Sequence, residues 1–551
     1  MKPEILFTSP CGPYPKLPPD KDPIDYFYYK NTFKQKMFQL RSFQSWHSLH
    51  FLAQNIPVAS VVMENPTMQV FQQEIKSGNY KIVAIGFTFI LTKKVLEMVE
   101  WLKAYQPEIE IIVGGYGTAI FKESIEESDR LKNLVDHICY GEGLGFIRAI
   151  IASKWNISGD YALKQNLLPI KNSFFRTHIE LFKQLVLVGG LGCVNGCSFC
   201  ATSSQFNRKH IPLFTGKALY NSLLTQSERY PEVQSAIIYE EDFLLNRPQV
   251  LEFIKHFESG VLSKRPFLLT VFASVKSISQ YTVEELIACG IGTIFIGVES
   301  LDDEVLLKEG FAKRKGGVIA LFEQLHDHGI NTLGSLIIGL DSQTAAIAKS
   351  DSEKFIEMNP TFYQVIPLHA VPGTKQWEVM KASGRISTGF TLELDGMADY
   401  NFNPENLSHA EVSELVLSTY YGLVDEGGPW PFRMFENLLK GYLNLKNNPN
   451  PVLSNRAGHY RKMISPVFVL AFVSRYFFFG KQFKRKWKKS MKQFMKAFPG
   501  YFMLSVLLSP VIAVVLLLIY GYGNVKYWLS PGGDQPDFWR GEYEGVGLEK
   551  K

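Results

Sequence analysis

Short apolar runs alternate with amphipathic segments over the first quarter of the chain. The runs KIVAIGFT, IEIIVGGYGT and HICYGEG end at or near glycines, and helical patterns such as Lys93 to Tyr105 separate them. Apolar strands that alternate with helices are typical of a parallel, doubly wound sheet. We therefore predict an α/β domain at residues 1–150. A polar linker without periodicity should follow at residues 151–180.

A second series of strand and helix units begins after this linker. Its apolar runs are QLVLVGG, SAIIYEEDF, FLLTVFASV, GTIFIGVES, NTLGSLIIGL and FYQVIPLH. Helical segments lie between them at residues 216–229, 248–258, 282–289 and 317–328. Such connections cross over, so the sheet should be mainly parallel. Six units predict a partial or full (β/α) barrel at residues 181–390, whose chemistry gathers at the carboxyl ends of the strands.

The rest of the chain contains a mainly helical region followed by an uncharged apolar segment. Residues 391–500 are more helical, carry no readable motif and end in the basic stretch KQFKRKWKKSMKQFMK. Residues 501–522 then carry no charge over a length that crosses a bilayer core of about 30 Å. Tyrosines and Trp528 stand near the ends, as interfacial aromatics do. We predict a helical C-terminal region with one membrane helix and a tail at residues 523–551; the alternative is a buried core helix.

The basic stretch sets an expected orientation for this membrane helix. By the positive-inside tendency its side is cytoplasmic, and the tail from Asn524 should lie on the far side. The stretch can also rest on anionic lipid. Pro510 should kink the span or make it re-entrant. No signal peptide is expected, because the N-terminus lacks a sustained apolar run. The protein should therefore be membrane-anchored with cytoplasmic catalytic domains.

Composition narrows the class of protein. A formal charge of +5 over 551 residues is small, so no nucleic-acid partner is expected. Three of the six cysteines crowd into eight positions, which is unlike a disulfide scaffold and fits a reducing compartment.

The clustered cysteines lie in LVGGLGCVNGCSFC, just beyond the first strand of the second series. This is where a loop overhangs a barrel mouth. Cys193, Cys197 and Cys200 can each hold one iron of a 4Fe-4S cluster and leave the fourth iron open. The loop's glycines allow tight backbone folding. Two alternatives remain: structural zinc with His210 as the nearby fourth ligand, or a disulfide.

The C-x-x-x-C-x-aromatic-C arrangement resembles the defining loop of radical S-adenosylmethionine (SAM) enzymes. GIGTIFIGVES, SLIIGL and IPLHAVPGT resemble later strands of that family, and IIYEEDFLLNR resembles the acidic stretch of its cobalamin-associated subgroup. VAIGFT, IIVGGYGT and YGEG resemble the cobalamin-binding domain of that subgroup. However, the D-x-H-x-x-G motif is missing, and neither His47 nor His50 has its setting. Cobalamin is therefore possible, and a vestigial or substrate-capping domain is the alternative.

The resemblance implies a set of cofactor contacts. The cluster's open iron takes the amino and carboxylate groups of SAM, whose cleavage gives a 5'-deoxyadenosyl radical. Phe199 should meet the adenine through its backbone. Glu299, at a strand end, should accept hydrogen bonds from the ribose; a salt bridge to the region of Lys308 or Lys313 is the alternative.

The acidic stretch offers the contact to the SAM ammonium group. Alternate strand residues point to opposite faces, so Glu240 and Asp242 are the expected inward pair and at least one acid of the stretch is solvated. The family's glycine-rich version of this motif is absent. No catalytic residue is predicted.

Together these features predict a membrane-anchored radical SAM enzyme. Its substrate would be hydrophobic, such as a lipid, isoprenoid or tetrapyrrole-like compound, modified by methylation, oxidation, cyclisation or carbon-carbon coupling. The resemblance implies a reducing partner such as flavodoxin or ferredoxin. The alternative is a non-catalytic, membrane-associated iron-sulfur redox sensor or electron carrier. Retention of Glu299 argues against it, because an electron carrier needs no ribose contact.

Overall fold

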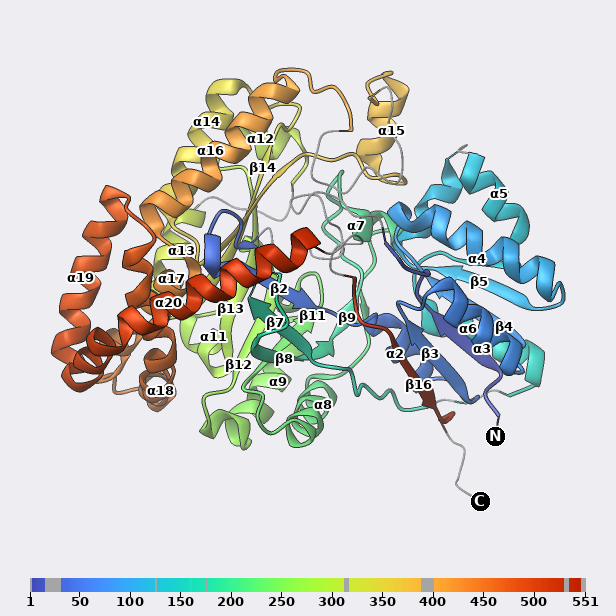
Figure 1. The fold of residues 1–551 in the computed structure, drawn as a ribbon, viewed down its shortest axis with the longest axis horizontal. Helices are drawn as coiled ribbons and strands as arrows, with labels where there is room; N and C mark the ends of the chain where they lie inside the picture. Colours follow the sequence, from blue (N-terminus) through green and yellow to red (C-terminus); the bar gives the residue numbers. More distant parts are fainter. Residues whose placement is uncertain are drawn as a thin grey trace.

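The computed structural model describes residues 2–14, 31–123, 126–157, 159, 161–174, 176–311, 317–387, 401–529 and 535–546. Two sheets lie side by side, and a group of C-terminal helices packs against the second sheet on the side away from the first (Figure 1).

The N-terminal sheet is the predicted doubly wound domain. Its parallel strands are β1 (Ile5–Thr8), β3 (Ser60–Glu64), β4 (Ile82–Gly86), β5 (Glu110–Gly114) and β6 (His137–Cys139), in the order β3-β1-β4-β5-β6. The connecting helices are α2 (His47–Gln54), α3 (Met68–Ser77), α4 (Thr92–Tyr105), α5 (Glu126–Leu134) and α6 (Gly143–Trp155). The strand order reverses at β1 and β4, and ligands of such sheets bind outside the carboxyl ends at this point.

The second sheet confirms the predicted partial barrel. Its parallel strands are β8 (Glu180–Val188), β11 (Ser235–Tyr239), β12 (Leu268–Ala273), β13 (Ile291–Glu299), β14 (Asn331–Ile338) and β15 (Phe362–Pro367). The intervening helices are α8 (Gly216–Arg229), α9 (Arg247–Ser259), α11 (Val283–Ala288), α13 (Val318–Asp327) and α14 (Ala345–Met358). Among the described strands the curled sheet stays open between β15 and its other edge, so it is a half-barrel.

Two antiparallel strands extend the half-barrel beyond β8. They are β7 (Ile170–Phe174), which lies in the stretch expected to be a linker, and β2 (Leu40–Phe43), which lies in the expected first domain. The adjacent residue Gln35 donates to the Tyr363 hydroxyl of β15 at 2.8 Å and accepts from the Trp430 backbone N–H at 2.7 Å. The N-terminal part of the chain thus contributes directly to the wall of the half-barrel.

The C-terminal region is helical, as predicted. Its helices are α16 (His409–Gly427), α17 (Trp430–Leu445), α18 (Pro451–Val473), α19 (Lys481–Ala497) and α20 (Pro499–Leu529). Aromatic side chains join them: Phe468 of α18 stacks on Phe494 of α19, with ring centroids 3.8 Å apart. Helix α20 is the one helix in the described parts of the chain that is long and apolar enough to cross a membrane, judged by length and composition.

The tail after α20 does not lie where the sequence predicted. Strand β16 (Trp539–Tyr543) pairs antiparallel with β3 over five residues, at the edge of the N-terminal sheet (Figure 1). Arg540 also forms an ion pair with Glu74 of α3, with Nε 2.9 Å from Oε2. The expected position on the far side of a membrane is therefore wrong. The positive-inside tendency predicts an orientation only for a helix that spans the membrane. In addition, the short segment WRGEY has no sequence feature that would predict its pairing with β3.

Candidate active site

The cysteine loop follows β8 at the carboxyl end of the half-barrel. A two-residue strand pair, β9 (Gly190–Leu191) with β10 (Ile211–Pro212), brings its two ends together. Gly192 and Gly196 have φ angles of 78° and 71°. A Cβ atom on Gly192 would lie 2.3 Å from the Lys209 carbonyl oxygen. These two glycines therefore permit a turn that other residues would strain.

The three loop cysteines are held by the backbone of the loop and of α7 (Ala201–Gln205). Cys197 is buried, whereas Cys193 and Cys200 are partly exposed. The Cys200 N–H donates to the Cys197 carbonyl at 3.1 Å. The Ser203 hydroxyl donates to the Cys193 carbonyl and accepts from the Gly196 N–H, at 3.3 and 3.0 Å. These hydrogen bonds hold the loop in the conformation that presents the three cysteines.

The chemistry of these donors suits a cluster better than a single ion. None of the three forms a disulfide. Among the described residues, no three His, Cys, Asp or Glu side chains converge on one metal position. His210, the fourth ligand of the zinc alternative, lies instead against Glu240, with Nε2 2.9 Å from Oε1. A 4Fe-4S cluster takes one thiolate per iron and needs no such convergence.

Glu240 is buried directly beside the loop. Its Oε1 accepts from His210, but its Oε2 has no hydrogen-bond partner among the described residues. A Cβ on Gly189 would lie 2.1 Å from this Oε2, so only glycine leaves space there. Burial raises the pKa of Glu240, and the hydrogen bond to Glu240 raises the pKa of His210. A buried carboxylate oxygen without a partner is costly, and an ammonium group would satisfy it.

Asp242 is also buried, but its carboxylate is already engaged by the protein. Oδ1 accepts from the Ser277 hydroxyl and the Ser274 N–H, and Oδ2 accepts from the Asn195 side chain at 3.3 Å. Asn195 belongs to the cysteine loop, and Ser274 is the N-cap of α10 (Val275–Ile278). Asp242 therefore ties the loop to the next strand-end turn.

Glu241 is the acid of this stretch that the sequence analysis left out of the inward pair. It is only partly buried by surface area, but it sits among Tyr116, Thr202 and the acids on either side. Burial raises its pKa. Tyr116 comes from the N-terminal domain, so no local pattern could have revealed this neighbourhood.

Glu299 ends β13 in a conformation that is unusual for a residue with a side chain. Its φ is 61°, and the pairing of β13 with β14 shifts register between Gly297 and Glu299. The side chain is buried. Lys308 pairs with Glu304, with Nζ 2.7 Å from Oε1, and Lys313 lies outside the described residues. Left-handed backbone at a buried strand-end acid is the kind of strain that is found at ligand sites.

Phe199 forms part of the wall behind the loop. Its ring meets Phe311 edge-on, with centroids 5.3 Å apart, next to Cys197 and Trp377. This packing fixes the backbone of residue 199, the part expected to meet the adenine.

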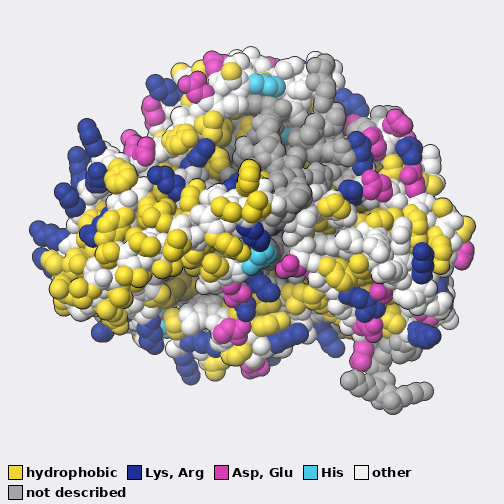
Figure 2. Space-filling view, in the orientation of Figure 1, with side chains coloured by type: hydrophobic (Ala, Val, Ile, Leu, Met, Phe, Trp, Pro, Cys, Tyr) yellow, Lys and Arg dark blue, Asp and Glu magenta, His cyan; other side chains and the backbone are white. Residues whose placement is uncertain are grey.

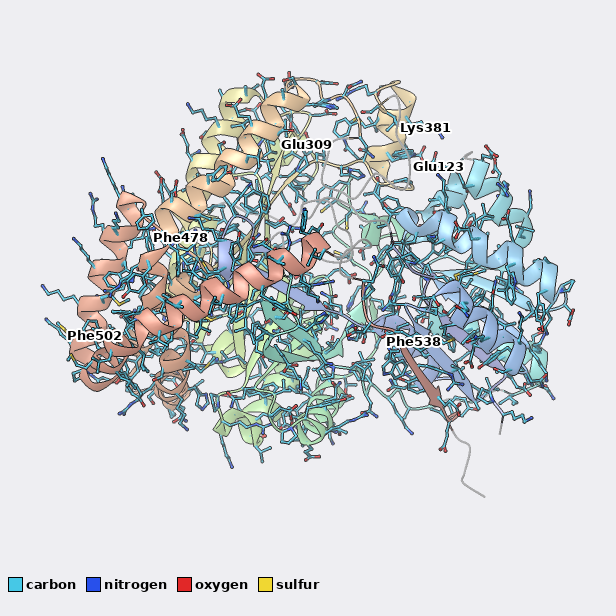
Figure 3. All side chains as sticks on the ribbon, viewed as in Figure 1. Glu123, Glu309, Lys381, Phe478, Phe502 and Phe538 are labelled. Carbon is cyan, nitrogen blue, oxygen red and sulfur yellow. The ribbon has the colours of Figure 1, made fainter. Side chains whose placement is uncertain are left out.

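The N-terminal domain contacts the segment that directly follows Cys200. Tyr116, after β5, has its hydroxyl 2.8 Å from the Thr202 hydroxyl of α7, and Gln205 donates to the Gly115 carbonyl at 3.3 Å. Lys381 of α15 (Lys375–Ala382) forms an ion pair with Glu123, with Nζ 2.5 Å from Oε2 (Figure 3). The carboxyl end of the N-terminal sheet therefore faces the cysteine loop.

His47 and His50, the two histidines considered as cobalt ligands, are hydrogen-bonded to other protein groups. His47 lies 3.0 Å from the Leu168 carbonyl, and burial lowers its pKa to about 4. His50 lies between Glu64, at 2.9 Å, and Tyr543, at 2.6 Å. His50 lies near the carboxyl end of the sheet, since Glu64 is the last residue of β3, but both of its ring nitrogens are hydrogen-bonded to protein groups.

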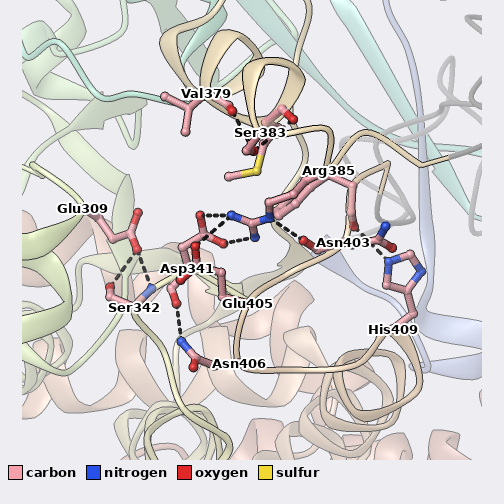
Figure 4. A network of polar contacts seen from close by, with 12 residues as sticks. Glu309, Asp341, Ser342, Val379, Ser383, Arg385, Asn403, Glu405, Asn406 and His409 are labelled. Carbon is pink, nitrogen blue, oxygen red and sulfur yellow. Dashed lines mark hydrogen bonds and ion pairs between the residues drawn. The ribbon is translucent and has the colours of Figure 1, made fainter.

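A polar pocket of about 590 Å³ opens on the outer side of the loop at Ser198. Its acids are already paired: Arg385 contacts Asp341 at 2.6 Å and Glu405 at 3.2 Å, and Glu309 accepts from Ser342 (Figure 4). This lining does not suit a hydrophobic substrate.

Comparison with known proteins matches this geometry to a family. Residues 187–349 match the Radical SAM superfamily. No curated protein is significantly similar in sequence. The radical SAM methyltransferase TsrM from Kitasatospora setae, with cobalamin and a [4Fe-4S] cluster bound, has a TM-score of 0.51 at 10% identity, covering 86% of this chain and 100% of TsrM. The cobalamin-dependent SAM radical enzyme OxsB, with aqua-cobalamin and SAM bound, gives 0.49 at 12% identity over 96% of this chain and 82% of OxsB. The likeness to TsrM confirms the fold.

Proposed function

We propose that this radical SAM enzyme, identified by the match of residues 187–349, modifies a hydrophobic, membrane-associated molecule. We also propose that it binds cobalamin at the carboxyl edge of its N-terminal sheet. The observation that carries the proposal is the contact of Tyr116 with Thr202, two residues beyond Cys200. It brings the carboxyl ends of two parallel sheets toward one another. Such ends are where cofactors and substrates bind in both kinds of sheet.

In this proposal Cys193, Cys197 and Cys200 hold a 4Fe-4S cluster. When bound, the cluster supplies the electron for reductive cleavage of SAM. Oε2 of Glu240 accepts hydrogen bonds from the ammonium group of SAM, because this oxygen is buried beside the loop without a described partner. Glu299 accepts from the ribose hydroxyls, and the backbone of Phe199 meets the adenine. Asp242 acts less directly, by holding Asn195 of the loop.

The residues of the N-terminal domain fit cobalamin only without a histidine on its lower face. His47 is hydrogen-bonded to the Leu168 carbonyl through Nε2. Both ring nitrogens of His50 are hydrogen-bonded within the protein, although His50 lies beside Glu64 at the carboxyl end of β3. Methylation through cobalamin and hydrogen abstraction that leads to oxidation, cyclisation or coupling both suit this arrangement. TsrM is a methyltransferase with the same fold, which favours methylation.

The hydrophobic substrate is inferred from the surface rather than from the pocket. Helix α20 exposes a long apolar face, and a molecule rich in hydrocarbon concentrates in membranes, since each buried methylene contributes about 0.8 kcal/mol. An enzyme held at the membrane meets such a substrate where it accumulates.

The test begins with anaerobically purified protein, in which iron, sulfide and cobalt are counted together. The protein is then incubated with dithionite, SAM carrying a deuterated methyl group and a membrane lipid extract. We expect four irons per chain, bound cobalt and deuterium in a lipid-soluble product. Iron without cobalt, with 5'-deoxyadenosine as the sole product, would contradict the cobalamin part. A complete absence of SAM cleavage would favour the electron carrier.

A further inference from the structure

Helix α20 turns its small and polar residues toward the protein. The residues that it buries against its neighbours are Ser505, Ser509, Ala513, Leu516 and Gly523. Their spacing of three, four or seven residues forms one narrow stripe. Within it, the Ser509 hydroxyl lies 3.0 Å from the Tyr476 hydroxyl. Half-buried apolar side chains flank this stripe and also pack against the core: Phe502, Val506, Ile512, Ile519 and Tyr520.

The outward face carries the large apolar side chains. Leu507 is 72% exposed, Leu518 is 68% exposed and Trp528 is 82% exposed. The other large side chains exposed along the helix are Tyr501, Met503, Leu504, Leu508, Val511, Val514, Val515, Leu517, Tyr522, Val525 and Leu529. They form the continuous yellow band over α20 in Figure 2. A surface helix of a soluble protein shows the opposite arrangement, and an apolar patch of this extent marks an interaction surface.

Basic residues lie on α19, the helix that directly precedes α20. The adjacent helix α19 buries Phe483, Met491 and Phe494 against the helices around it. Its exposed cations are Lys481, Lys484, Arg485, Lys488, Lys489, Lys492 and Lys496. An apolar surface beside a row of cations is complementary to a membrane with anionic headgroups.

Both ends of α20 are fixed to the same folded body. At the start, Phe502 packs edge-on against Phe472 of α18, with ring centroids 5.9 Å apart (Figure 3). Toward the end, Arg176 donates to Asn524 at 2.6 Å and lies 3.9 Å from the centroid of the Tyr527 ring. The chain then continues into β16 on the N-terminal sheet. A helix that crossed the bilayer would place its ends about 30 Å or more apart on opposite sides, and these contacts would be lost.

We propose that α20 is an in-plane membrane anchor. It lies along one leaflet with its apolar face among the acyl chains, while the α19 cations contact anionic headgroups and the rest of the chain stays on one side. This proposal concerns the mode of membrane association and holds whichever reaction the enzyme performs.

The first experiment measures flotation of the full-length protein with vesicles of phosphatidylcholine that contain about one-third phosphatidylglycerol. The double variant Leu507→Glu/Leu518→Glu should bind at least about tenfold less, because it places carboxylates in the acyl region. Both positions face outward, so the fold is retained. The matched control is Leu307→Glu, at an 81% exposed leucine of α12 (Asp303–Lys308), which should bind like the wild type.

The second experiment separates an in-plane helix from a spanning one. Epitope tags are placed at residue 1 and after residue 551, and their accessibility is compared in right-side-out and inside-out vesicles. We expect both tags on the same side. Tags on opposite sides would overturn the proposal, as would equal vesicle binding by the double variant. A detergent-free dimer that the double variant dissociates would show that a second copy covers the face instead.

Discussion

Cys193, Cys197 and Cys200 differ from the other three cysteines in their setting. Cys11, Cys139 and Cys289 are buried apart from one another, and burial raises the pKa of Cys11 and of Cys139 to about 12. Thiolates are the metal ligands, so these thiols are poor ones. We expect alanine at any of the three loop positions to abolish cluster iron and SAM cleavage. Iron and sulfide analysis checks this, and full iron content in Cys197→Ala would contradict the assignment. Cys139→Ala is the control that keeps both.

We expect the charge of the Glu240 carboxylate to contribute to SAM binding. Glu240→Gln preserves shape and can keep a contact with His210 but removes the charge next to the vacant hydrogen-bonding position at Oε2. We expect SAM to bind at least about tenfold more weakly, because hydrogen bonds to a charged acceptor contribute about 1.5–3 kcal/mol. Equilibrium binding to cluster-loaded protein is the measurement. Glu232→Gln, on the exposed surface, serves as the control. Unchanged affinity would remove Glu240 from the SAM site.

His47 predicts a pH dependence of stability. Burial lowers its pKa from 6.5 to about 4, so the unfolded chain binds this proton first as the pH falls. The stability contributed by the neutral form is therefore present above pH 6.5 and is lost toward pH 4, by about 3 kcal/mol. Urea unfolding of His47→Gln should show a correspondingly weaker pH dependence than the wild type. His137→Gln, at a partly exposed position, should follow the wild type. Equal slopes for His47→Gln and the wild type would show that His47 titrates normally.

The same histidines predict the spectrum of any bound cobalamin. Since His47 and His50 are both hydrogen-bonded to other groups of the protein, the Co(II) form should show no nitrogen superhyperfine splitting from this chain in electron paramagnetic resonance. A splitting that disappears in His47→Gln would overturn this expectation.

Candidate site residues could be identified from the sequence where they lie close together along the chain. The cysteine loop is one continuous motif, and the conformations of Gly192 and Gly196 explain its glycines. The neighbours of Glu241 were not predictable, because Tyr116 reaches it from another domain. The hydrogen bonds of Asp242 were also not predictable, since Ser274 and Ser277 lie more than 30 residues away in the sequence.

At the scale of elements, Asp242 tests whether the acidic stretch positions the loop. The residue accepts from Ser277 and Ser274 at the N-terminus of α10 and from Asn195 of the loop. Asp242→Ala should lower the free energy of unfolding by about 1–3 kcal/mol, because it leaves buried donors without a partner. Denaturant unfolding measures this. Glu241→Ala, at a less enclosed position, should cost less. A larger loss of stability in Glu241→Ala would contradict this division of roles.

The parallel strands and their helices were predicted from continuous apolar runs, and helix α8 spans the predicted residues 216–229. Strands β2 and β7 were missed for a physical reason. Their sequences, LRSF and IKNSF, are short and mixed in polarity, and they pair antiparallel at the margin of the sheet. Such strands depend on a partner that is distant in sequence rather than on a local pattern.

At the scale of the whole molecule, the C-terminal helices belong to the core and are not a detachable anchor. Phe494 of α19 stacks on Phe468 of α18, and Phe502 of α20 packs on Phe472. A truncation after residue 490 would remove these contacts and expose α18, so its loss of activity would not report membrane binding alone. Substitutions on the outward face of α20 avoid this problem, because those side chains make little contact with the protein.

The C-terminal strand β16 pairs with β3 at the edge of the N-terminal sheet. Strand β16 covers the hydrogen-bonding groups that β3 would otherwise expose. Tyr543 reaches His50 at 2.6 Å, and Trp539 packs edge-on against the same ring, with centroids 4.6 Å apart. Removing β16 therefore opens both a sheet edge and a buried polar cluster. This closure could not be predicted from a local pattern, because the paired strands Ser60–Glu64 and Trp539–Tyr543 lie near opposite ends of the sequence.

We expect truncation after residue 534 to lower hydrogen-exchange protection of the β3 amides by at least about tenfold, since several ladder hydrogen bonds at about 1 kcal/mol each are lost. Exchange measured by mass spectrometry on peptides that cover Ser60–Glu64 checks this. Peptides from β14, which lies in the other sheet, are the internal reference and should not change. Truncation after residue 546 keeps β16 and should behave like the full chain. If the β3 amides stay equally protected without β16, the pairing of β16 with β3 does not stabilise the N-terminal sheet. The chain would then be free to carry its C-terminal segment elsewhere, including across a membrane.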